Sequence, residues 1–299
     1  MDADVMVVGE ALVDVVRTAD GETSEHPGGS AANVAVALAR LGRGVRFATS
    51  YADDAHGRLL GEHLRTSGVE LALDPHVVER TSTAAATIGA DGAATYEFDL
   101  DWRLGEVPLS PAPAAVHVCS LGAVVEPGAS AVLELVEQLR EQATTTYDVN
   151  VRAAVTGTGS EVVERVERVV ALADLVKVSD EDLTELWPTL PVEQAAARLL
   201  SMGPAAVVLT RGGEGATWFD HEREVTVAPR PVVVADTIGA GDTFAAALVD
   251  GLAEEGLLGG RLPALPAEVV ERLLAHAAQA AAVTVSRPGA DPPYRSELG

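Results

Sequence analysis

The sequence predicts an α/β fold in which a largely parallel central sheet is covered by helices on both faces. Short, continuously apolar strand segments alternate with amphipathic helical segments along the chain, and no internal repeat or long linker interrupts them. The 299 residues, of which 47% are hydrophobic, are enough for a substantial core. We therefore expect residues 1–299 to form a single domain, although the length alone would also fit two small ones.

Six segments have the composition of buried strands, at residues 5–8, 45–49, 116–119, 145–149, 175–178 and 206–210. Seven segments have apolar residues at helical spacing, at residues 31–41, 56–66, 129–142, 161–172, 193–202, 243–254 and 268–285. Because connections between parallel strands are right-handed, the carboxyl ends of the strands should lie on one side, where ligands bind in such folds.

Residues 81–98 break this alternation and predict a β-hairpin. Their two extended runs flank Asp91-Gly92, a pair that favours a two-residue turn. A further extended stretch at residues 11–17 is able to pair with the hairpin, which gives a small sheet built from about residues 11–17 and 80–102. Two interpretations remain open: the small sheet is a lid over a binding site, or it is an ordinary edge hairpin.

The chain is strongly acidic, with a formal net charge of −24. Such a surface repels nucleic acid and anionic membranes, so we expect neither as a partner. No segment has the length and hydropathy of a membrane span, and the N-terminus lacks the basic and apolar regions of a signal peptide. These features favour a cytoplasmic protein.

Cys119 and Lys177 are the only cysteine and the only lysine of the chain. A single cysteine excludes an internal disulfide and a cysteine metal cluster, and its apolar surroundings predict a buried, inert thiol. The lone lysine lies outside any Gly-x-x-x-x-Gly-Lys pattern, which excludes a phosphate-binding loop of that type.

The most informative segment is residues 236–248, Asp-Thr-Ile-Gly-Ala-Gly-Asp-Thr-Phe-Ala-Ala-Ala-Leu. Gly239, Ala240 and Gly241 allow backbone amides to converge at the start of a helix, where free amides and the helix dipole favour an anion. Asp242 follows directly, and a carboxylate beside an anion site is suited to accept a proton while negative charge develops there. The alternative is structural, because aspartate is also a common N-cap.

A second segment, Pro27-Gly28-Gly29-Ser30-Ala31-Ala32-Asn33, opens the helix expected at residues 31–41. Ser30 is a candidate N-cap, the glycines permit close approach by a ligand, and the Asn33 side chain offers both a donor and an acceptor. Taken alone, this segment also fits a plain transition from loop to helix.

Together the two segments resemble the paired signatures of the ribokinase-like (PfkB) sugar kinase family, in the same order and over essentially the whole chain. Residues 9–14, 148–152 and 176–182 are similar to runs in the bacterial fructokinases of that family. The resemblance implies a three-layer α/β/α sandwich with a mostly parallel central sheet and a small β-sheet lid.

The resemblance also implies a role for each matching residue. Asp242 corresponds to the catalytic base, and the anion hole corresponds to Gly239, Ala240 and Gly241 with the Asp242 amide. Sugar hydroxyls are expected at Asp14, Gly28, Gly29 and Asn33, with Arg152 near the substrate or the phosphates. The nucleotide is expected beside Thr210, Gly212, Gly215 and Asp182. Many members hold a monovalent cation such as K⁺ in the region of Asp236, Ile238 and the loop 286–290, which contains Gly289.

One position departs from the family pattern. Many members carry Asn-x-x-Glu before the nucleotide site, where the glutamate supports Mg²⁺ through water, and the matching run here is Ser179-Asp180-Glu181-Asp182. Serine in place of asparagine is also typical of fructokinases. Asp182 is one methylene shorter than glutamate, so the support of the metal is expected to be weaker or to shift to Glu181.

These observations predict a kinase that uses ATP and Mg²⁺ to phosphorylate a primary hydroxyl of a small sugar, with fructose or a related ketose favoured. Kinases for 2-keto-3-deoxygluconate, ribose or a nucleoside remain open, as does a non-catalytic sugar or nucleotide sensor on the same fold. A nicotinamide dehydrogenase is disfavoured because no Gly-x-Gly-x-x-Gly follows the first strand. The expected assembly is a monomer or a homodimer formed through the lid.

Overall fold

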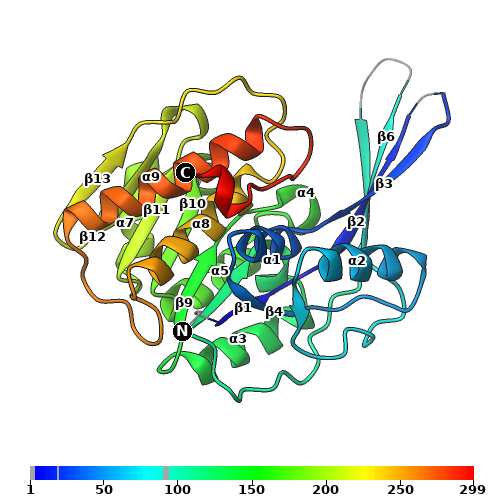
Figure 1. Cartoon of the computed structure of the whole chain (residues 1–299), viewed down its shortest axis with the longest axis horizontal. Helices are drawn as coiled ribbons and strands as arrows, with labels where there is room; N and C mark the ends of the chain where they lie inside the picture. The colour runs from blue at the N-terminus through cyan, green and yellow to red at the C-terminus, as the bar shows by residue number, and fades with distance from the viewer. Residues whose placement is uncertain (1–3, 19, 90–93) are drawn as a thin grey trace.

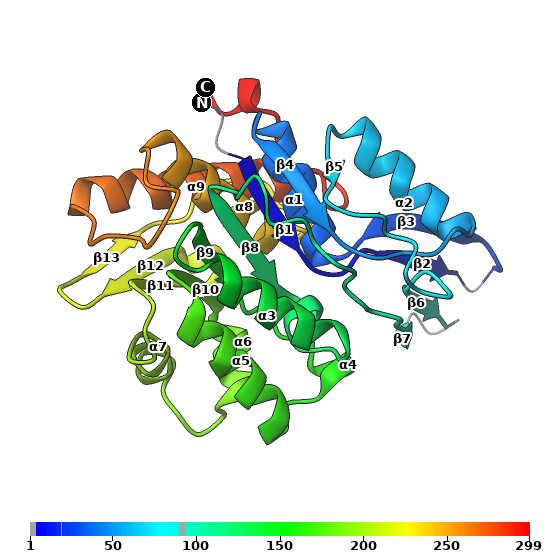
Figure 2. The same cartoon turned by 90° about the horizontal axis from the view of Figure 1, so that it is seen from below.

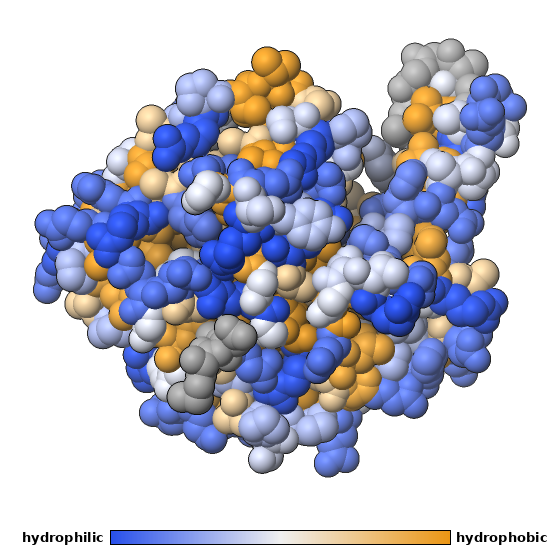
Figure 3. All heavy atoms as spheres, viewed as in Figure 1, coloured by the Kyte–Doolittle hydropathy of each residue, from blue (hydrophilic) through white to orange (hydrophobic). Residues whose placement is uncertain are grey.

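A computed structural model describes residues 4–18, 20–89 and 94–299. The molecule has a broad body of helices packed on a sheet, from which a narrow arm of strands projects (Figure 1). Hydrophilic side chains cover much of one face of the body, with smaller apolar areas between them (Figure 3).

The body contains a nine-stranded sheet within the described residues. Its strands are β1 (Asp4–Val8), β4 (Gly44–Ala48), β5 (Glu70–Leu71), β8 (Ala115–Cys119), β9 (Thr144–Asp148), β10 (Leu175–Ser179), β11 (Ala206–Thr210), β12 (Ala216–Asp220) and β13 (Glu224–Val227). They lie in the order β13-β12-β11-β10-β9-β8-β1-β4-β5. All neighbours from β5 to β11 pair in parallel, and only β12 and β13 add antiparallel pairs at one edge. The prediction of a mostly parallel sheet is therefore confirmed.

Helices cover both faces of this sheet (Figure 2). One face carries α1 (Ser30–Arg40), α8 (Ala240–Glu254) and α9 (Ala267–Val285), with α2 (Ala55–Thr66) beside them. The other face carries α3 (Gly128–Leu139), α4 (Ala153–Thr156), α5 (Ser160–Leu172), α6 (Asp180–Leu186) and α7 (Val192–Leu200). Short 3-10 turns lie at Ser120–Ala123, Gly212–Glu214 and Arg295–Glu297. None of the helices described here is both long and apolar enough to cross a membrane.

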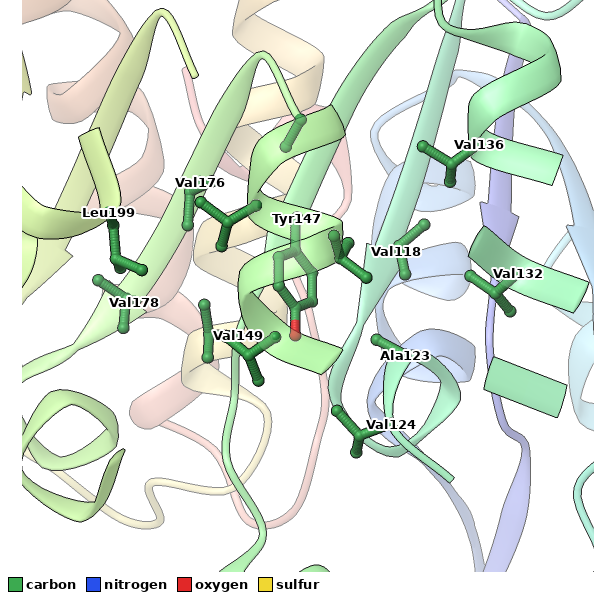
Figure 4. Packing of buried hydrophobic residues seen from close by; sticks show 14 of the residues in the cluster. Val118, Ala123, Val124, Val132, Val136, Tyr147, Val149, Val176, Val178 and Leu199 are labelled. Atoms are coloured by element: carbon green, nitrogen blue, oxygen red, sulfur yellow. The ribbon is translucent and has the colours of Figure 1, made fainter. Parts of the chain in front are cut away.

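The two faces of the central strands bury different side chains, because successive residues of a strand point to opposite sides. On the side of α3, α5 and α7, Tyr147 of β9 lies between Val118 of β8 and Val176 of β10 (Figure 4). The next residue, Asp148, therefore points to the opposite face, toward α8. Every residue of β9 is buried, so any charge placed on this strand needs a partner within the protein.

The projecting arm is a second, four-stranded sheet in the order β3-β2-β6-β7. Its strands are β3 (Thr23–Gly28), β2 (Leu12–Arg17), β6 (Thr83–Ile88) and β7 (Ala94–Asp99). The expected hairpin is present as the antiparallel pair β6 and β7, and residues 12–17 pair with it as expected. The turn predicted at Asp91-Gly92 lies outside the described residues. Strand β3 was not expected, because most of its side chains are polar and exposed.

We expect truncation of a single core residue on α7 to test the packing in Figure 4. Leu199 is fully buried, so Leu199→Ala should lower the free energy of unfolding by about 2–5 kcal/mol through lost burial and a residual cavity. Gln194 is exposed on the same helix, and Gln194→Ala should change stability by less than about 0.5 kcal/mol. Urea denaturation of both variants measures the difference; equal stabilities would refute the packing.

Candidate functional site

The candidate site lies where strand ends of the sheet meet the first turns of two helices. Glu10 follows β1, Asn150 follows β9, Ser30 begins α1 and Asp242 lies in the first turn of α8. The two motifs of the sequence are thus brought together, although Ser30 and Asp242 are 212 positions apart in the chain.

Asp242 is 6% exposed, and its carboxylate is held by three side chains. The Ser30 hydroxyl donates to Oδ1 at 2.6 Å, and Asn33 Nδ2 donates to Oδ2 at 2.8 Å. Asn150 Nδ2 donates to the Ser30 oxygen at 2.9 Å and lies 3.4 Å from Asp242 Oδ1. Both oxygens of the carboxylate are therefore fixed in direction before any substrate arrives.

Ser30 does not serve as the N-cap that the sequence suggested. The cap position of α1 is Gly29, with a φ of 97°, and no side chain caps the helix. A Cβ at Gly29 would lie 2.8 Å from the Glu10 carbonyl oxygen, so the chain needs a glycine there for both its conformation and the close approach. This turn places Ser30 inside the helix, where its hydroxyl is directed to Asp242 instead.

The turn before Asp242 leaves backbone amides free. Gly239 caps α8 in the left-handed region, with a φ of 74°. The Ala240 amide contacts the Thr237 carbonyl at 3.3 Å, but within the described part of the chain the amides of Gly241 and Asp242 have no acceptor. Free amides at the start of a 15-residue helix form a site that favours an anion. We call residues 239–242 the anion loop.

Glu10 helps to hold Ser30 in place beside Asp242, which the sequence did not reveal. Its buried carboxyl group accepts hydrogen bonds from the Ser30 amide at 3.1 Å and from the Gly122 amide at 2.7 Å. Burial raises its pKa from about 4.5 to about 7, the two amides oppose that rise, and the charge of Asp242 adds to it. Glu10 thus links β1, the first turn of α1 and the 3-10 turn at Ser120–Ala123.

The expected sugar-binding residues lie on and beside the small sheet. Gly28 leaves room for Asp14, because a Cβ at Gly28 would lie 2.2 Å from the Asp14 carboxylate. Burial raises the pKa of Asp14, and the charges of His26 and Arg152 oppose this. Arg152 itself is exposed, so its guanidinium is near Asp14 and open to a ligand.

Two aromatic rings lie on the same face of the small sheet as Asp14, and the sequence did not indicate this. Asp14, Ala84 and Phe98 lie in one cross-strand row, which puts their side chains on one face. Tyr96 lies on this face two residues from Phe98, and the two rings stack with centroids 6.4 Å apart. The opposite face, with Val15, packs into the core beside α2. The rings are 62% and 37% exposed, so this face is open.

The expected nucleotide-binding residues follow β10 and β11. Thr210 ends β11, and Gly212 and Gly215 follow with φ values of 47° and 99°. Asp182 is buried in the first turn of α6, where one carboxylate oxygen accepts the Ser179 amide at 2.9 Å and the other accepts the Val151 amide at 2.7 Å. Its carboxylate therefore joins the end of β10 to the turn after β9.

The residues expected to hold a monovalent cation lie in two loops that contact each other. The Asp236 carboxylate accepts the Ile238 amide at 3.0 Å and the Gly289 amide at 2.8 Å, which ties residues 236–238 to the loop 286–290. Those amide contacts lower the pKa of Asp236. A Cβ at Gly239 would lie 2.7 Å from the Ala290 Cβ, so this loop pair also supports the anion loop.

Known proteins that are similar to this chain are carbohydrate kinases. Residues 2–297 match the pfkB family of carbohydrate kinases. A fructokinase of Klebsiella pneumoniae is 31% identical over 309 aligned residues, which cover 100% of this chain and 99% of that protein. A fructokinase of Rhizobium leguminosarum bv. trifolii is 33% identical, with 85% of this chain and 81% of that protein covered. A fructokinase double mutant from Vibrio cholerae O395, in its fructose-, ADP- and potassium-bound form, has a TM-score of 0.81 and 27% identity, covering 99% of this chain and 97% of that one.

The raised pKa of Glu10 predicts a pH-dependent contribution to stability. A carboxyl group whose pKa rises from 4.5 in the unfolded chain to about 7 in the folded one stabilises the fold fully below pH 4.5, and this contribution is lost as the pH rises through about 7. Glu10→Gln removes that titration. The stability of the native protein relative to this variant should therefore fall by about 3 kcal/mol between pH 4.5 and 8.

Urea unfolding of both proteins across this pH range measures the effect. The same comparison with Glu137→Gln, a change at an exposed residue of α3, controls for the general effect of removing a carboxylate. A stability difference between native protein and Glu10→Gln that does not change with pH would rule out the raised pKa.

Proposed function

Because the chain belongs to the pfkB family of carbohydrate kinases and is an ATP-dependent sugar kinase, we propose that it phosphorylates a primary hydroxyl of fructose or of a related ketose. The observation that carries this proposal is the juxtaposition of the Asp242 carboxylate with the free amides of the anion loop. The similarity to fructokinases over nearly the full chain favours the ketose.

In the proposed reaction, Asp242 is the catalytic base. The sugar oxygen forms a bond to the γ-phosphorus of ATP, the bond from that phosphorus to the β,γ-bridging oxygen breaks, and its electron pair leaves with ADP. The hydroxyl proton passes to Asp242 as the bond to phosphorus forms, because that bond acidifies the hydroxyl. Ser30 and Asn33 hold the carboxylate in position for this transfer.

The anion loop stabilises the transferred group. Phosphoryl transfer passes through a loose transition state with negative charge spread over the phosphoryl oxygens, so fixed donors contribute more than covalent chemistry. The amides of Gly241 and Asp242 are oriented and free, and the dipole of α8 adds to their effect. Gly239 and Ala240 shape the turn that exposes them.

We assign sugar binding to Asp14, Gly28, Gly29, Asn33 and Arg152. Asp14 is able to accept hydrogen bonds from vicinal hydroxyls, and the glycines let the sugar approach the backbone. Asn33 already donates one hydrogen bond to Asp242, so its amide oxygen and second N–H are the atoms left for the sugar.

The small sheet is proposed as a lid of a single kinase domain. Asp14 and the Phe98 and Tyr96 rings share its open face, while its other face is anchored beside α2. Closure of this face over the sugar would exclude water, which would otherwise compete with the sugar for the phosphoryl group.

The residues present fit the two cation types expected. No group of three or more metal-ligating side chains exists among the described residues, and Mg²⁺ bound mainly through phosphates and water needs none. Asp182 would support that Mg²⁺ through water, beside a nucleotide bordered by Thr210, Gly212 and Gly215. Asp236, Ile238 and Gly289 would hold K⁺. Bound Mg²⁺ neutralises part of the nucleotide charge.

A sugar acid such as 2-keto-3-deoxygluconate is the second candidate substrate. The specific observation in its favour is Arg152, whose charge acts on Asp14 and whose side chain is exposed. A coupled assay of ADP release with fructose, ribose, nucleosides and sugar acids, with and without K⁺, separates these candidates. Turnover highest with fructose supports the ketose; binding of sugar and ATP without any turnover would support a sensor instead.

We expect Asp242→Asn to lower kcat by about 10²- to 10⁴-fold, because an amide cannot accept the proton. The buried amide is nearly the same size as the carboxylate, so the protein should remain folded. Asp53 is exposed and pairs with Arg58 instead of with a residue of the site, so Asp53→Asn should leave kcat unchanged. Steady-state kinetics with fructose and ATP test this; near-native turnover of Asp242→Asn would remove Asp242 from the role of base.

We expect Phe98→Ala to raise KM for the sugar by about 5- to 30-fold, because an aromatic wall over the sugar would be lost. Its neighbour Glu97 pairs with Ala85 on the opposite face of the lid, so Glu97→Ala is the matched control and should leave KM unchanged. An equal KM in both variants would show that the open face of the small sheet does not contact the sugar.

A further inference from the structure

Lys177, the only lysine of the chain, lies inside the protein behind the candidate site. It is 6% exposed and belongs to β10, in register with Asp148 of the neighbouring β9. Its Nζ donates to both Asp148 oxygens, at 2.8 and 2.9 Å. Both side chains point to the face that α8 covers, since Tyr147 and Val176 point to the other face.

The Lys177 ammonium group lies directly behind the anion loop. A Cβ placed on Gly241 would be 3.3 Å from Nζ, so no side chain separates the ammonium group from the backbone of Gly241. The Gly241 amide is one of the free donors of the loop, and Asp242 is the next residue. The loop therefore has free amides on its open side and a buried positive charge on its inner side.

The stability of the fold does not account for this ion pair. Taking two charges out of water is costly, and replacing a buried pair by apolar side chains is often neutral or stabilising. The neighbouring residues of β10 are the apolar Leu175, Val176 and Val178. An aliphatic residue at position 177 would suit such a strand, so the charge calls for another explanation.

The positive charge of Lys177 offsets several acidic residues near the anion loop. Glu10, Asp148, Asp182 and Asp242 are all buried near the anion loop. Burial acts to lower the pKa of Lys177, but the charges of Asp148, Asp182 and Asp242 raise it, so its ammonium group stays charged at neutral pH. Without that charge, an incoming triphosphate would meet a site dominated by carboxylates.

The surroundings of Lys177 admit very little water. The cavity beside it has a volume of about 10 Å³, which is room for no more than about one water molecule. His117 also lines this cavity, and burial together with the charge of Lys177 lowers its pKa to about 3, so it is neutral. Because Asp148 pairs with Lys177, the two groups act together as a dipole, and its positive end faces Gly241. In such a dry region that dipole acts strongly on groups a few ångströms away.

We propose that Lys177 is a positioning residue of the phosphoryl transfer, which supplies the buried positive charge behind the anion loop and acts on the transferred group through Gly241 and Asp242 without touching it. Asp148 keeps that ammonium group in place behind the loop. This inference rests on the proposed kinase function and adds a charge to the anion site that the backbone amides alone do not provide.

Two single variants and their combination separate this role from a structural one. Lys177→Met keeps the length of the side chain but leaves Asp148 unpaired, so it should lose both stability and turnover. Combining it with Asp148→Asn removes both charges and should restore most of the thermal stability. In this double variant kcat should remain lower than in the native protein by about 10²-fold, a size typical for loss of one electrostatic donor. In Asp148→Asn alone the amide oxygen still accepts a hydrogen bond from Lys177 Nζ, so the ammonium group is kept and the loss of kcat should be smaller than in the double variant.

A double variant with native kcat would overturn the proposal and leave Lys177 a purely structural residue. Failure of the native protein to phosphorylate any sugar would instead refute the proposed function, so the two outcomes are distinguishable.

A measurement on the native protein avoids any problem of folding. Incorporation of ¹³C-labelled lysine gives a single side-chain Cε signal, since the chain has one lysine. We expect that signal to shift little with ADP and Mg²⁺ alone, and to shift clearly when aluminium fluoride and fructose are added to mimic the transferring group. Identical Cε shifts in the two states would overturn the proposal.

Discussion

The candidate site depends on one constraint: the carboxylate of Asp242 is fixed among donors that come from distant parts of the chain. Ser30 and Asn33 belong to the first turn of α1, Asn150 follows β9, and Asp242 belongs to the first turn of α8. Burying a carboxylate costs free energy unless hydrogen bonds satisfy it. The donors reach Asp242 because the central sheet brings the first turns of α1 and α8 together at its edge. The fold and the chemistry of the site are therefore coupled through a single group.

The backbone at the strand ends shows the same coupling. Ser120 and Asn150 follow β8 and β9 with φ values of 49° and 41°, a conformation that is uncommon for residues other than glycine. The Ser120 hydroxyl donates to the Asn150 carbonyl at 3.1 Å, so each residue helps to hold the other. The conformation directs the Asn150 amide toward Ser30 and Asp242. Local strain of this kind is typical of functional sites, where the surrounding structure maintains it.

The sequence was sufficient to predict those strands, helices and turns that depend only on residues close together in the chain. The strands of the parallel sheet are continuous apolar runs, the main helices show regular apolar spacing, and the glycines before Asp242 mark the turn that opens α8. Strand β3 was missed because its exposed polar residues lack any alternation. The contacts of Glu10, Asn150 and Lys177 were missed because they depend on which strands are neighbours in the sheet. The aromatic face of the small sheet required the register that pairs Ala84 with Phe98.

The most direct test of this account is a crystal structure of the protein with ADP, Mg²⁺, aluminium fluoride and fructose. We predict that the fluoride complex accepts hydrogen bonds from the amides of Gly241 and Asp242, and that a primary hydroxyl of the sugar lies within about 3 Å of the Asp242 carboxylate. A fluoride complex bound away from the anion loop, or a sugar with no hydroxyl near Asp242, would show that this carboxylate is not the base and that the site has been assigned wrongly.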